Sequence, residues 1–376
     1  MTTTTRSAFA SVCEPMLYVA FELSATRWKL AMTSGFGIDP RVRTVAAGDV
    51  KAIQRVIEEG RRRFGLAAGV AVQSCYEAGR DGFWIHRALT TLGIANRVVD
   101  SASIEVDRRA RRAKTDRIDA LKLVRMLVRV CAGERGVWHE VRVPSVADEA
   151  ARQVSRERGT LVQEQTRLRN QMRSWLTTWG CHLPARRTAA WWTTLRDWAG
   201  GSLPQTLQAR LERADARYTL VAAQIAALDA HHRAAAQAAS VDSALGRLIR
   251  LKGVAATGAA ILIEEGLVWR DFRNRRQIGG ILGYAPTPYE SGDMHHDQGI
   301  SGAGNRRLQA VSIQLAWSWV HWQPQSPLTR WYRERFAQGG RLRRIGIVAV
   351  ARRLVIALWR YATTGIVPAE AILKVA

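Results

Sequence analysis

Four acidic residues have the types and spacing that a metal-dependent reaction at phosphate requires. Glu22 and Glu77 each follow an apolar run, and Asp116 and Asp119 lie three residues apart, which places them on one face of a helix. The chain carries 56 Lys and Arg against 32 Asp and Glu, a formal charge of +24. Acids gathered at such places in a basic chain indicate a Mg²⁺ site, because Mg²⁺ prefers carboxylate oxygens and Mn²⁺ can substitute for it.

Basic residues surround the two aspartates. They are Arg111, Arg112, Lys114 and Arg117, and we expect them to draw a phosphodiester into a site that acids alone would repel. Taken alone, Asp119 is better interpreted as a solvated helix residue that pairs with an arginine. Taken with Glu22 and Glu77, a site for one or two metal ions is favoured, of the kind that supports in-line displacement at phosphorus.

The elements that would position these acids alternate between strand and helix. Strands are predicted at 16–21, 28–32, 42–47, 69–74 and 95–99, and helices at 50–64, 82–92 and 116–130. An antiparallel pair followed by strand–helix alternation predicts an α/β domain of ribonuclease-H type over residues 14–135. Strand ends and a helix start can meet at one edge of such a sheet.

A long helical segment is predicted over residues 144–240. Ser145 with Asp148 three residues later is a helix start signal. Apolar residues then recur every seven residues from Val154, and again in a seam from Leu207 to Leu228. This pattern predicts an antiparallel coiled-coil hairpin able to dimerise, although an internal bundle without a partner role is equally compatible. Its first helix has arginines that we expect at a nucleic-acid backbone: Arg152, Arg156, Arg158, Arg167, Arg169 and Arg173.

The last unit is predicted over residues 245–376. Residues 249–260 resemble a helix-hairpin-helix, in which Gly253 would present the turn to phosphate. Residues 279–298 are rich in Gly and Pro and are predicted as a loop. Helices are predicted at 306–322 and 343–361, most simply as core. Arg306 and Arg307 are candidate phosphate contacts, or the basic start of a helix.

Composition restricts the partners and the compartment. A sequence pI near 11.2, carried mostly by arginine, indicates a polyanionic partner such as DNA or RNA; a simply basic protein is the alternative. The four cysteines are far apart and form no C-x-x-C pair, so neither a zinc site nor a disulfide framework is indicated. No apolar run is long enough to span a bilayer. These features predict a cytoplasmic protein without membrane contact.

Two pairs of motifs resemble a known family. Residues 75–82 (Cys-Tyr-Glu-Ala-Gly-Arg-Asp-Gly) and 111–120 (Arg-Arg-Ala-Lys-Thr-Asp-Arg-Ile-Asp-Ala) are similar to the RuvC-like DEDD domain of insertion-sequence transposases. Residues 283–292 and 299–308, with Gly-Ile-Ser-Gly-Ala-Gly-Asn-Arg-Arg-Leu in the second, are similar to that family's C-terminal transposase domain. The resemblance spans nearly the whole chain in the family's order. It implies a RuvC-like domain, a coiled coil and a mostly helical transposase domain.

The resemblance also implies a mechanism and partners. The DEDD tetrad would be Glu22, Glu77, Asp116 and Asp119, although the family's first acid is usually Asp. A serine of the last domain would attack DNA and form a covalent phosphoserine; Ser291 is the first choice and Ser301 the second. A structured guide RNA would pair with donor and target DNA, and the recombinase would act as a dimer or tetramer.

Two other functions agree with the same residues. A junction-resolving nuclease would keep the tetrad, use water as nucleophile and leave Ser291 structural. A non-catalytic nucleic-acid-binding relative would have lost activity, with Glu22 as a sign of that loss.

Overall fold

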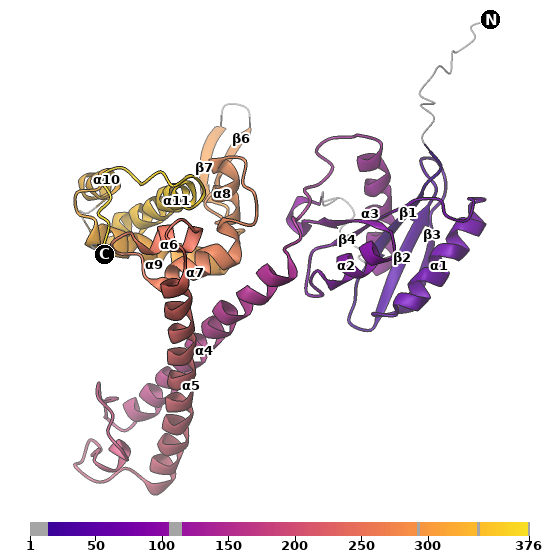
Figure 1. The fold of residues 1–376 in the computed structure, drawn as a ribbon. Helices are drawn as coiled ribbons and strands as arrows, with labels where there is room; N and C mark the ends of the chain where they lie inside the picture. Colours follow the sequence, from indigo (N-terminus) through magenta and orange to yellow (C-terminus); the bar gives the residue numbers. More distant parts are fainter. Residues whose placement is uncertain (1–13, 105–114, 292–293, 337–338, 375–376) are drawn as a thin grey trace, which may run out of the picture. The chain divides into compact units, whose positions relative to one another are not determined.

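The computed structural model describes residues 14–104, 115–291, 294–336 and 339–374. The chain divides into two compact units, residues 1–143 and 144–376 (Figure 1). None of the helices in the described ranges is long and apolar enough to cross a membrane.

Unit 1 (residues 1–143) is built on a mixed five-stranded sheet. The strands are β1 (Leu17–Glu22), β2 (Arg27–Thr33), β3 (Arg41–Ala46), β4 (Val72–Glu77) and β5 (Ala95–Val99), in the order β3-β2-β1-β4-β5. β1 runs antiparallel to β2 and parallel to β4, and β4 runs parallel to β5. The antiparallel start and parallel continuation agree with the mixed α/β architecture that the sequence predicts.

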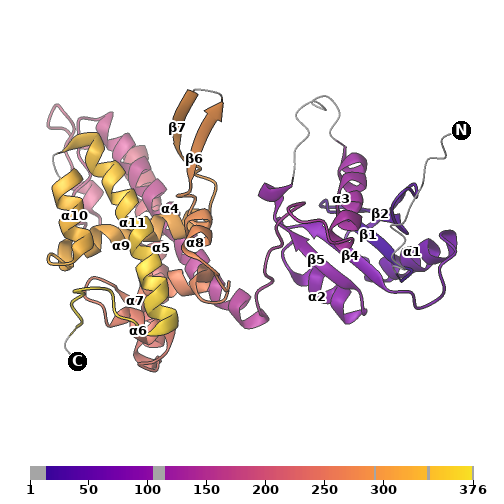
Figure 2. The ribbon, with the colours of Figure 1, turned by 90° about the horizontal axis from the view of Figure 1, so that it is seen from above.

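Helices cover both faces of this sheet. α1 (Val50–Arg63) and α2 (Trp84–Thr91) pack on the face to which Leu17, Val19 and Phe21 point. α3 (Asp116–Cys131) packs on the opposite face, against Ala20 and its neighbours (Figure 2). The alternation along β1 follows from the two-residue period of a strand, which sends successive side chains to opposite faces.

Unit 2 (residues 144–376) begins with two long helices, α4 (Val146–Thr177) and α5 (Gln205–Ala238), that pack on each other. The predicted start of α4 is confirmed: Ser145 accepts from the Asp148 N–H at 3.0 Å, and Asp148 accepts in return from the Ser145 N–H. An apolar cluster lies near the connector, where Met172 and Leu176 meet Leu207 and Leu211. Val154, at the start of the seven-residue pattern, is only half-buried.

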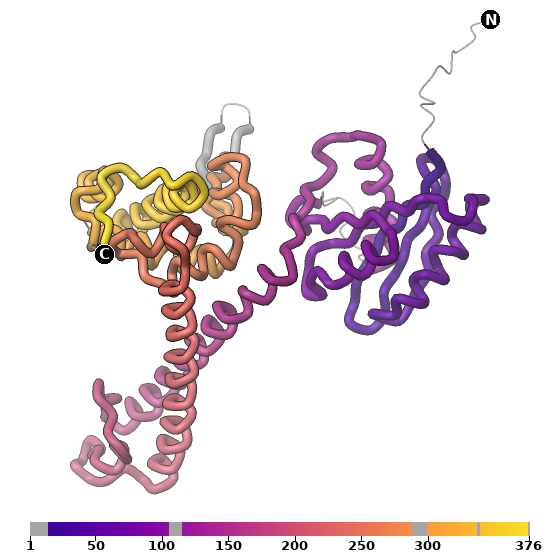
Figure 3. The backbone as a smooth tube through the Cα atoms, in the orientation of Figure 1, coloured from indigo at the N-terminus to yellow at the C-terminus, as the bar shows by residue number. Residues whose placement is uncertain are grey.

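The remainder of unit 2 is a mostly helical body. Its elements are α6 (Ala244–Ile249), α7 (Ala256–Leu262), the π-helical η3 (Ile263–Leu267), α8 (Arg275–Ile281), β6 (Pro286–Ser291), β7 (Met294–Ile300), α9 (Arg306–Trp322), α10 (Pro327–Phe336) and α11 (Gly340–Thr364). α9 and α11 pack together through fully buried residues such as Ala316, Leu354 and Leu358. The tube trace follows these helices from the end of α5 to the C-terminal part of the chain (Figure 3).

The prediction of a loop over residues 279–298 is wrong. The segment finishes α8 and then forms the antiparallel β6–β7 hairpin, with Pro286 opposite Ile300 and Ser291 opposite Met294. Both strands of a two-stranded hairpin are edge strands, and an edge strand tolerates proline because one side of it needs no N–H donor. The proline content that indicated a loop is therefore compatible with β6.

Candidate active site

Glu22 and Glu77 lie side by side at one edge of the sheet of unit 1. β1 and β4 are parallel, and Phe21 is in register with Tyr76, so the two acids follow at the same level on neighbouring strands. Ala20 and Cys75, two residues before each acid, both belong to the core under α3. Since residues two apart share a face, both acids lie on the α3 face of the sheet.

The first turn of α3 brings the two aspartates to this same face. Thr115 caps the helix by accepting from the Ile118 N–H, and Asp116 and Asp119 lie in its first turn, where the helix dipole favours acids. Ala120, directly after Asp119, is completely buried against the sheet. Asp119 is half-buried and Asp116 exposed.

The acids share a face but do not form a closed cluster. Over the described ranges of the chain, no three Asp, Glu, His or Cys side chains lie close enough to hold one metal ion together. The predicted metal ligands are nevertheless all carboxylates, from β1, β4 and α3. Oxygen donors of this kind suit a hard divalent cation such as Mg²⁺, whereas zinc sites are built mainly from Cys and His.

Of the four basic residues predicted beside the acids, one lies within the described part of the chain. Arg111, Arg112 and Lys114 lie outside the described residues, and Arg117 is exposed on the first turn of α3. The register adds a cation that the sequence reasoning missed: Lys29 on β2 is the cross-strand partner of Glu22. Cross-strand partners share a face, so the pairing of the 16–21 and 28–32 strands could have identified it.

The two candidate serines occupy opposite ends of the β6–β7 hairpin. Ser291 is the last residue of β6; its side chain is outside the part that the structure describes. Ser301 directly follows β7, and its N–H donates to the Ala285 carbonyl at 2.9 Å while its hydroxyl donates to the Gly283 carbonyl at 3.3 Å. Ser301 therefore closes the foot of the hairpin, as a turn residue would.

Gly253 lies in the turn between α6 and α7, where its backbone conformation and close packing both favour a glycine. Its φ is +88°, and an added Cβ would lie 3.1 Å from the Trp322 Cβ and 3.2 Å from the Ser318 carbonyl oxygen. The Ser318 hydroxyl also donates to the Gly253 carbonyl at 2.6 Å. Two short helices flank this turn, in agreement with the predicted helix-hairpin-helix, and the phosphate contact at Gly253 stays a prediction.

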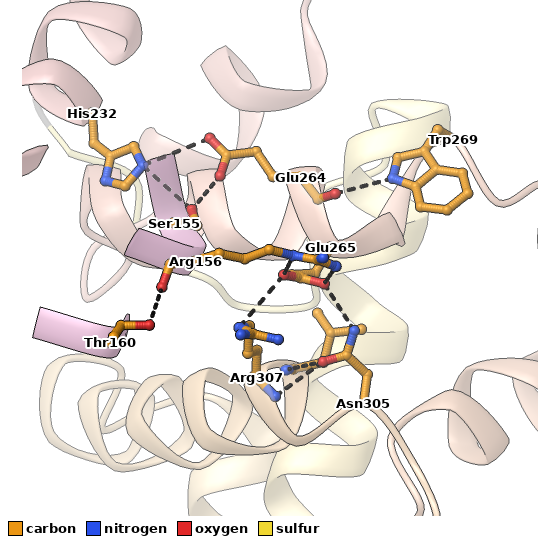
Figure 4. Close-up of polar contacts among 10 residues, drawn as sticks. Ser155, Arg156, Thr160, His232, Glu264, Glu265, Trp269, Asn305 and Arg307 are labelled. Atoms are coloured by element: carbon orange, nitrogen blue, oxygen red, sulfur yellow. Dashed lines mark hydrogen bonds and ion pairs between the residues drawn. The ribbon is translucent and has the colours of Figure 1, made fainter. Parts of the chain in front are cut away.

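A second group of carboxylates lies inside unit 2 (Figure 4). The Glu265 side chain is completely buried and accepts from the Arg156 guanidinium at 3.0 and 3.2 Å and from the Asn305 amide at 2.9 Å. Burial alone would raise the pKa of Glu265, but these hydrogen bonds, together with the charges of Arg156 and Arg307, outweigh burial and lower the pKa. Arg307, a predicted phosphate contact, has its Nε 3.9 Å from Glu265, while Arg306 is exposed.

Two further contacts of this group tie α4 to the rest of unit 2. Arg158 donates to Asp229 at 2.6 and 3.2 Å, and Thr257 donates to the same carboxylate at 2.9 Å. Hydrogen bonding from Arg158 is the main cause of a lowered pKa at Asp229. One turn away, the Ser155 hydroxyl donates to Glu264.

The expectation that these α4 arginines contact nucleic acid needs correction. Arg156 and Arg158 hold buried or half-buried carboxylates, and Arg152 is itself buried, with its guanidinium 5.2 Å from the centre of the Trp269 ring. Their partners lie far along the chain, so local spacing did not reveal them. Arg167, Arg169 and Arg173 are exposed.

Comparisons with known proteins connect both units to one family. Residues 246–330 match the family described as "Transposase IS116/IS110/IS902 family", and residues 46–180 match the DEDD transposase domain of IS110 elements. Glu77, Asp116 and Asp119 lie inside the second match, and Glu22 precedes it. A DEDD domain indicates dependence on a divalent metal.

Two relatives from Sinorhizobium fredii (strain NBRC 101917 / NGR234) are similar over most of their length. "Putative transposase y4rJ" is 39% identical over 378 residues, covering 95% of this chain and 94% of the relative. "Putative transposase y4qE" is 27% identical over 343 residues, covering 84% and 81%. With this identity over nearly the full length, the chain belongs to the IS110/IS116/IS902 family of transposases, enzymes of DNA transposition and recombination.

Proposed function

We propose that this transposase cuts and rejoins DNA with Mg²⁺ at the acidic edge of unit 1 and with Ser291 as the nucleophile. The observation that carries the proposal is the register of β1 and β4, which sets Glu22 beside Glu77 on the face that α3 covers. Asp116 and Asp119 begin that helix. The four carboxylates are thus the DEDD tetrad, with Glu in the first position.

The chain's own residues have distinct tasks at this edge. Glu22, Glu77, Asp116 and Asp119 hold the cation, which when bound neutralises charge at the phosphodiester; Mn²⁺ can replace Mg²⁺. Glu22 reaches one methylene further than Asp would, so it can serve from a backbone that lies further back. Lys29, beside Glu22 on β2, offers a cation to the DNA backbone.

Ser291 has a separate task in unit 2. Its Oγ attacks phosphorus, a serine–phosphate bond forms, one phosphorus–oxygen bond of the DNA breaks, and the departing strand end takes up a proton. The reverse attack by a free strand-end hydroxyl releases the serine, so rejoining needs no external energy. Because a serine hydroxyl is a weak nucleophile, a base or a metal must activate it.

The remaining parts supply assembly and specificity. We assign residues 14–135 to the RuvC-like domain, 144–240 to a coiled-coil hairpin for assembly as a dimer or tetramer, and 245–376 to the transposase domain. A structured guide RNA supplies specificity by pairing with donor and target DNA, since a charge of +24 suits binding to several nucleic-acid strands. Arg111, Arg112, Lys114, Arg117, Gly253 and Arg306 are the proposed backbone contacts, with Arg307 as a secondary one.

A search for DNA covalently attached to the protein tests the nucleophile. The chain is expressed with its flanking DNA and RNA, and denaturing gels compare wild type with Ser291→Ala and Ser301→Ala. We expect an adduct in wild type and Ser301→Ala that is absent in Ser291→Ala. An adduct in Ser291→Ala that is absent in Ser301→Ala would move the nucleophile to Ser301.

Two other outcomes would reject the serine mechanism. Metal-dependent cuts without any adduct would indicate a nuclease that uses water. Neither cuts nor adduct, with the RNA shown to be present, would indicate a binding protein.

A further inference from the structure

A large cavity lies at the foot of the β6–β7 hairpin, lined by residues of α8, α10 and α11. α11 packs against both α8 and α10 and lies between them in the ribbon view (Figure 2). The cavity volume is about 850 Å³, within the range of cavities that hold small organic ligands. Arginines from α8 and α11 make up much of its wall: Arg275, Arg276, Arg341, Arg344, Arg352 and Arg353. Among the residues whose side chains the structure describes, no acidic one lines it.

Apolar side chains make up the rest of the wall, and some of them face solvent. Ile345 on α11 is 50% exposed and Ile300 at the end of β7 is 48% exposed. Trp331 and Phe336 of α10 are in edge-on contact, with ring centres 5.2 Å apart, and also line the cavity. An open apolar surface surrounded by cations suits a ligand that is both flat and anionic.

The arginines of the cavity are held by packing. The Arg353 guanidinium lies 4.0 Å from the centre of the Trp331 ring. The Arg352 guanidinium lies over Gly279, where an added Cβ would be 3.2 Å from its Nε. Across the part of the chain that the structure describes, none of the six arginines is in an ion pair with a carboxylate. Unlike Arg156 and Arg158, they keep their charge for a ligand.

We propose that this cavity binds an unpaired nucleotide, with the base against the apolar wall and the adjoining phosphates on the arginines. Pockets that bind single-stranded nucleic acid combine these two features, because every base has an apolar face and every step of the strand has a phosphate. Double-stranded DNA would fit less well, since its bases are stacked and paired inside the helix.

The identity of the strand rests on the proposed function. Strand exchange releases DNA bases from pairing, and β6 connects the foot of the hairpin to Ser291. The five steps from Pro286 to Ser291, at about 3.3 Å each, give roughly 17 Å. The captured nucleotide would therefore lie a few positions along the strand from the phosphodiester that Ser291 attacks.

Binding measured by fluorescence anisotropy tests the cavity without any strand cleavage. The probes are a labelled oligodeoxythymidylate, the matching oligouridylate and a DNA duplex of mixed sequence. Ile345→Glu places an acid inside the cavity; Leu342→Glu, which is 52% exposed on the same helix but outside the cavity, is its matched control. Arg344→Glu is matched by Arg360→Glu, an equal change of charge further along α11.

We expect Ile345→Glu to weaken single-strand binding by roughly tenfold or more and to affect duplex binding no more than Leu342→Glu does. Arg344→Glu should weaken single-strand binding more than Arg360→Glu does. Equal loss in Ile345→Glu and Leu342→Glu, or equal loss for single strands and duplex, would overturn the proposal. Weaker binding of the uridylate identifies DNA as the source, and stronger binding identifies the RNA. A missing covalent adduct would reject the serine mechanism and leave this result unaffected.

Discussion

The carboxylates of the two units differ in exposure and in pairing. At the sheet edge of unit 1, Glu77 and Asp116 are exposed at the end of a strand and the start of a helix. In unit 2, Glu265 is buried, paired with the charge of Arg156 and hydrogen-bonded by the Asn305 amide. The acids of unit 1 leave negative charge where a cation can reach it. In unit 2 the charge of Glu265 is paired, and the pair holds α4 to the body of the unit.

This difference shows how acids of a basic protein divide between function and stability. A buried carboxylate without a partner is costly, so burial and pairing come together. An exposed carboxylate at an element end contributes little to stability. Substitutions should therefore separate activity from stability, with opposite outcomes in the two units.

The largest effect is expected at the sheet edge. Glu77→Gln or Asp116→Asn should lower metal-dependent strand cleavage at least about a hundredfold, because each would remove a proposed charged ligand of the metal. Unfolding free energy should change by no more than about 1 kcal/mol, since both positions are exposed and only Asp116 loses a favourable interaction with a helix dipole. Cleavage assays with Mg²⁺ and Mn²⁺, together with urea unfolding, measure both.

Glu59→Gln is the control for this pair of substitutions. Glu59 is exposed on α1, on the opposite face of the sheet, and its loss should leave cleavage intact. If Glu77→Gln cleaved DNA like wild type, the sheet edge would not be the metal site.

In unit 2 the effect should fall on stability. Glu265→Gln leaves Arg156 without its carboxylate partner and should cost about 2–4 kcal/mol of unfolding free energy. Urea unfolding of the whole chain, followed by a spectroscopic signal from unit 2, measures this change in unfolding free energy. Glu212→Gln, an exposed position on α5, is the matched control and should change little. A loss no larger than in the control would mean that the buried pair does not hold α4 in place.

The paired carboxylates of unit 2 also predict that the stability of the protein depends on pH. The pKa values of Glu265 and Asp229 are lowered in the folded chain. Their contribution is thus complete above the unfolded values, about 4.3 for Glu and 3.9 for Asp, and is lost as the pH falls through the lower folded values. The urea midpoint of wild type should decrease on acidification more steeply than that of Glu265→Gln. Parallel curves for the two proteins would contradict this assignment.

The sequence predicted individual strands and helices well, because these depend on residues that are close together in the chain. The strand at 95–99 and the helix starting at Asp116 are confirmed, because each has its own apolar period or cap. The fourth strand was predicted at 69–74 and lies at Val72–Glu77, so Glu77 is the last residue of the strand. The acidic edge followed from strand order, which a ribonuclease-H-type pattern implies.

Long-range pairing was beyond the reach of such patterns. Arg156 and Glu265 lie 109 residues apart in the chain, and nothing in the spacing of either predicts the other. The arginines of α4 therefore looked like one nucleic-acid surface, although half of them are internal. The cavity beside α11 was missed for the same reason, since its wall combines residues from α8, α10 and α11.

The smallest effect is expected at Thr257, which tests whether each hydrogen bond of the buried group counts. Thr257→Val keeps the shape of the side chain and removes the donor 2.9 Å from Asp229, while Arg158 still holds that carboxylate. The cost should be about 1 kcal/mol, and Thr257→Ser, which retains the hydroxyl, should lose less. If the serine variant were the weaker of the two, packing of the Thr257 methyl would be the stabilising contact. The contrast with the sheet edge would then rest on the arginine pairs alone.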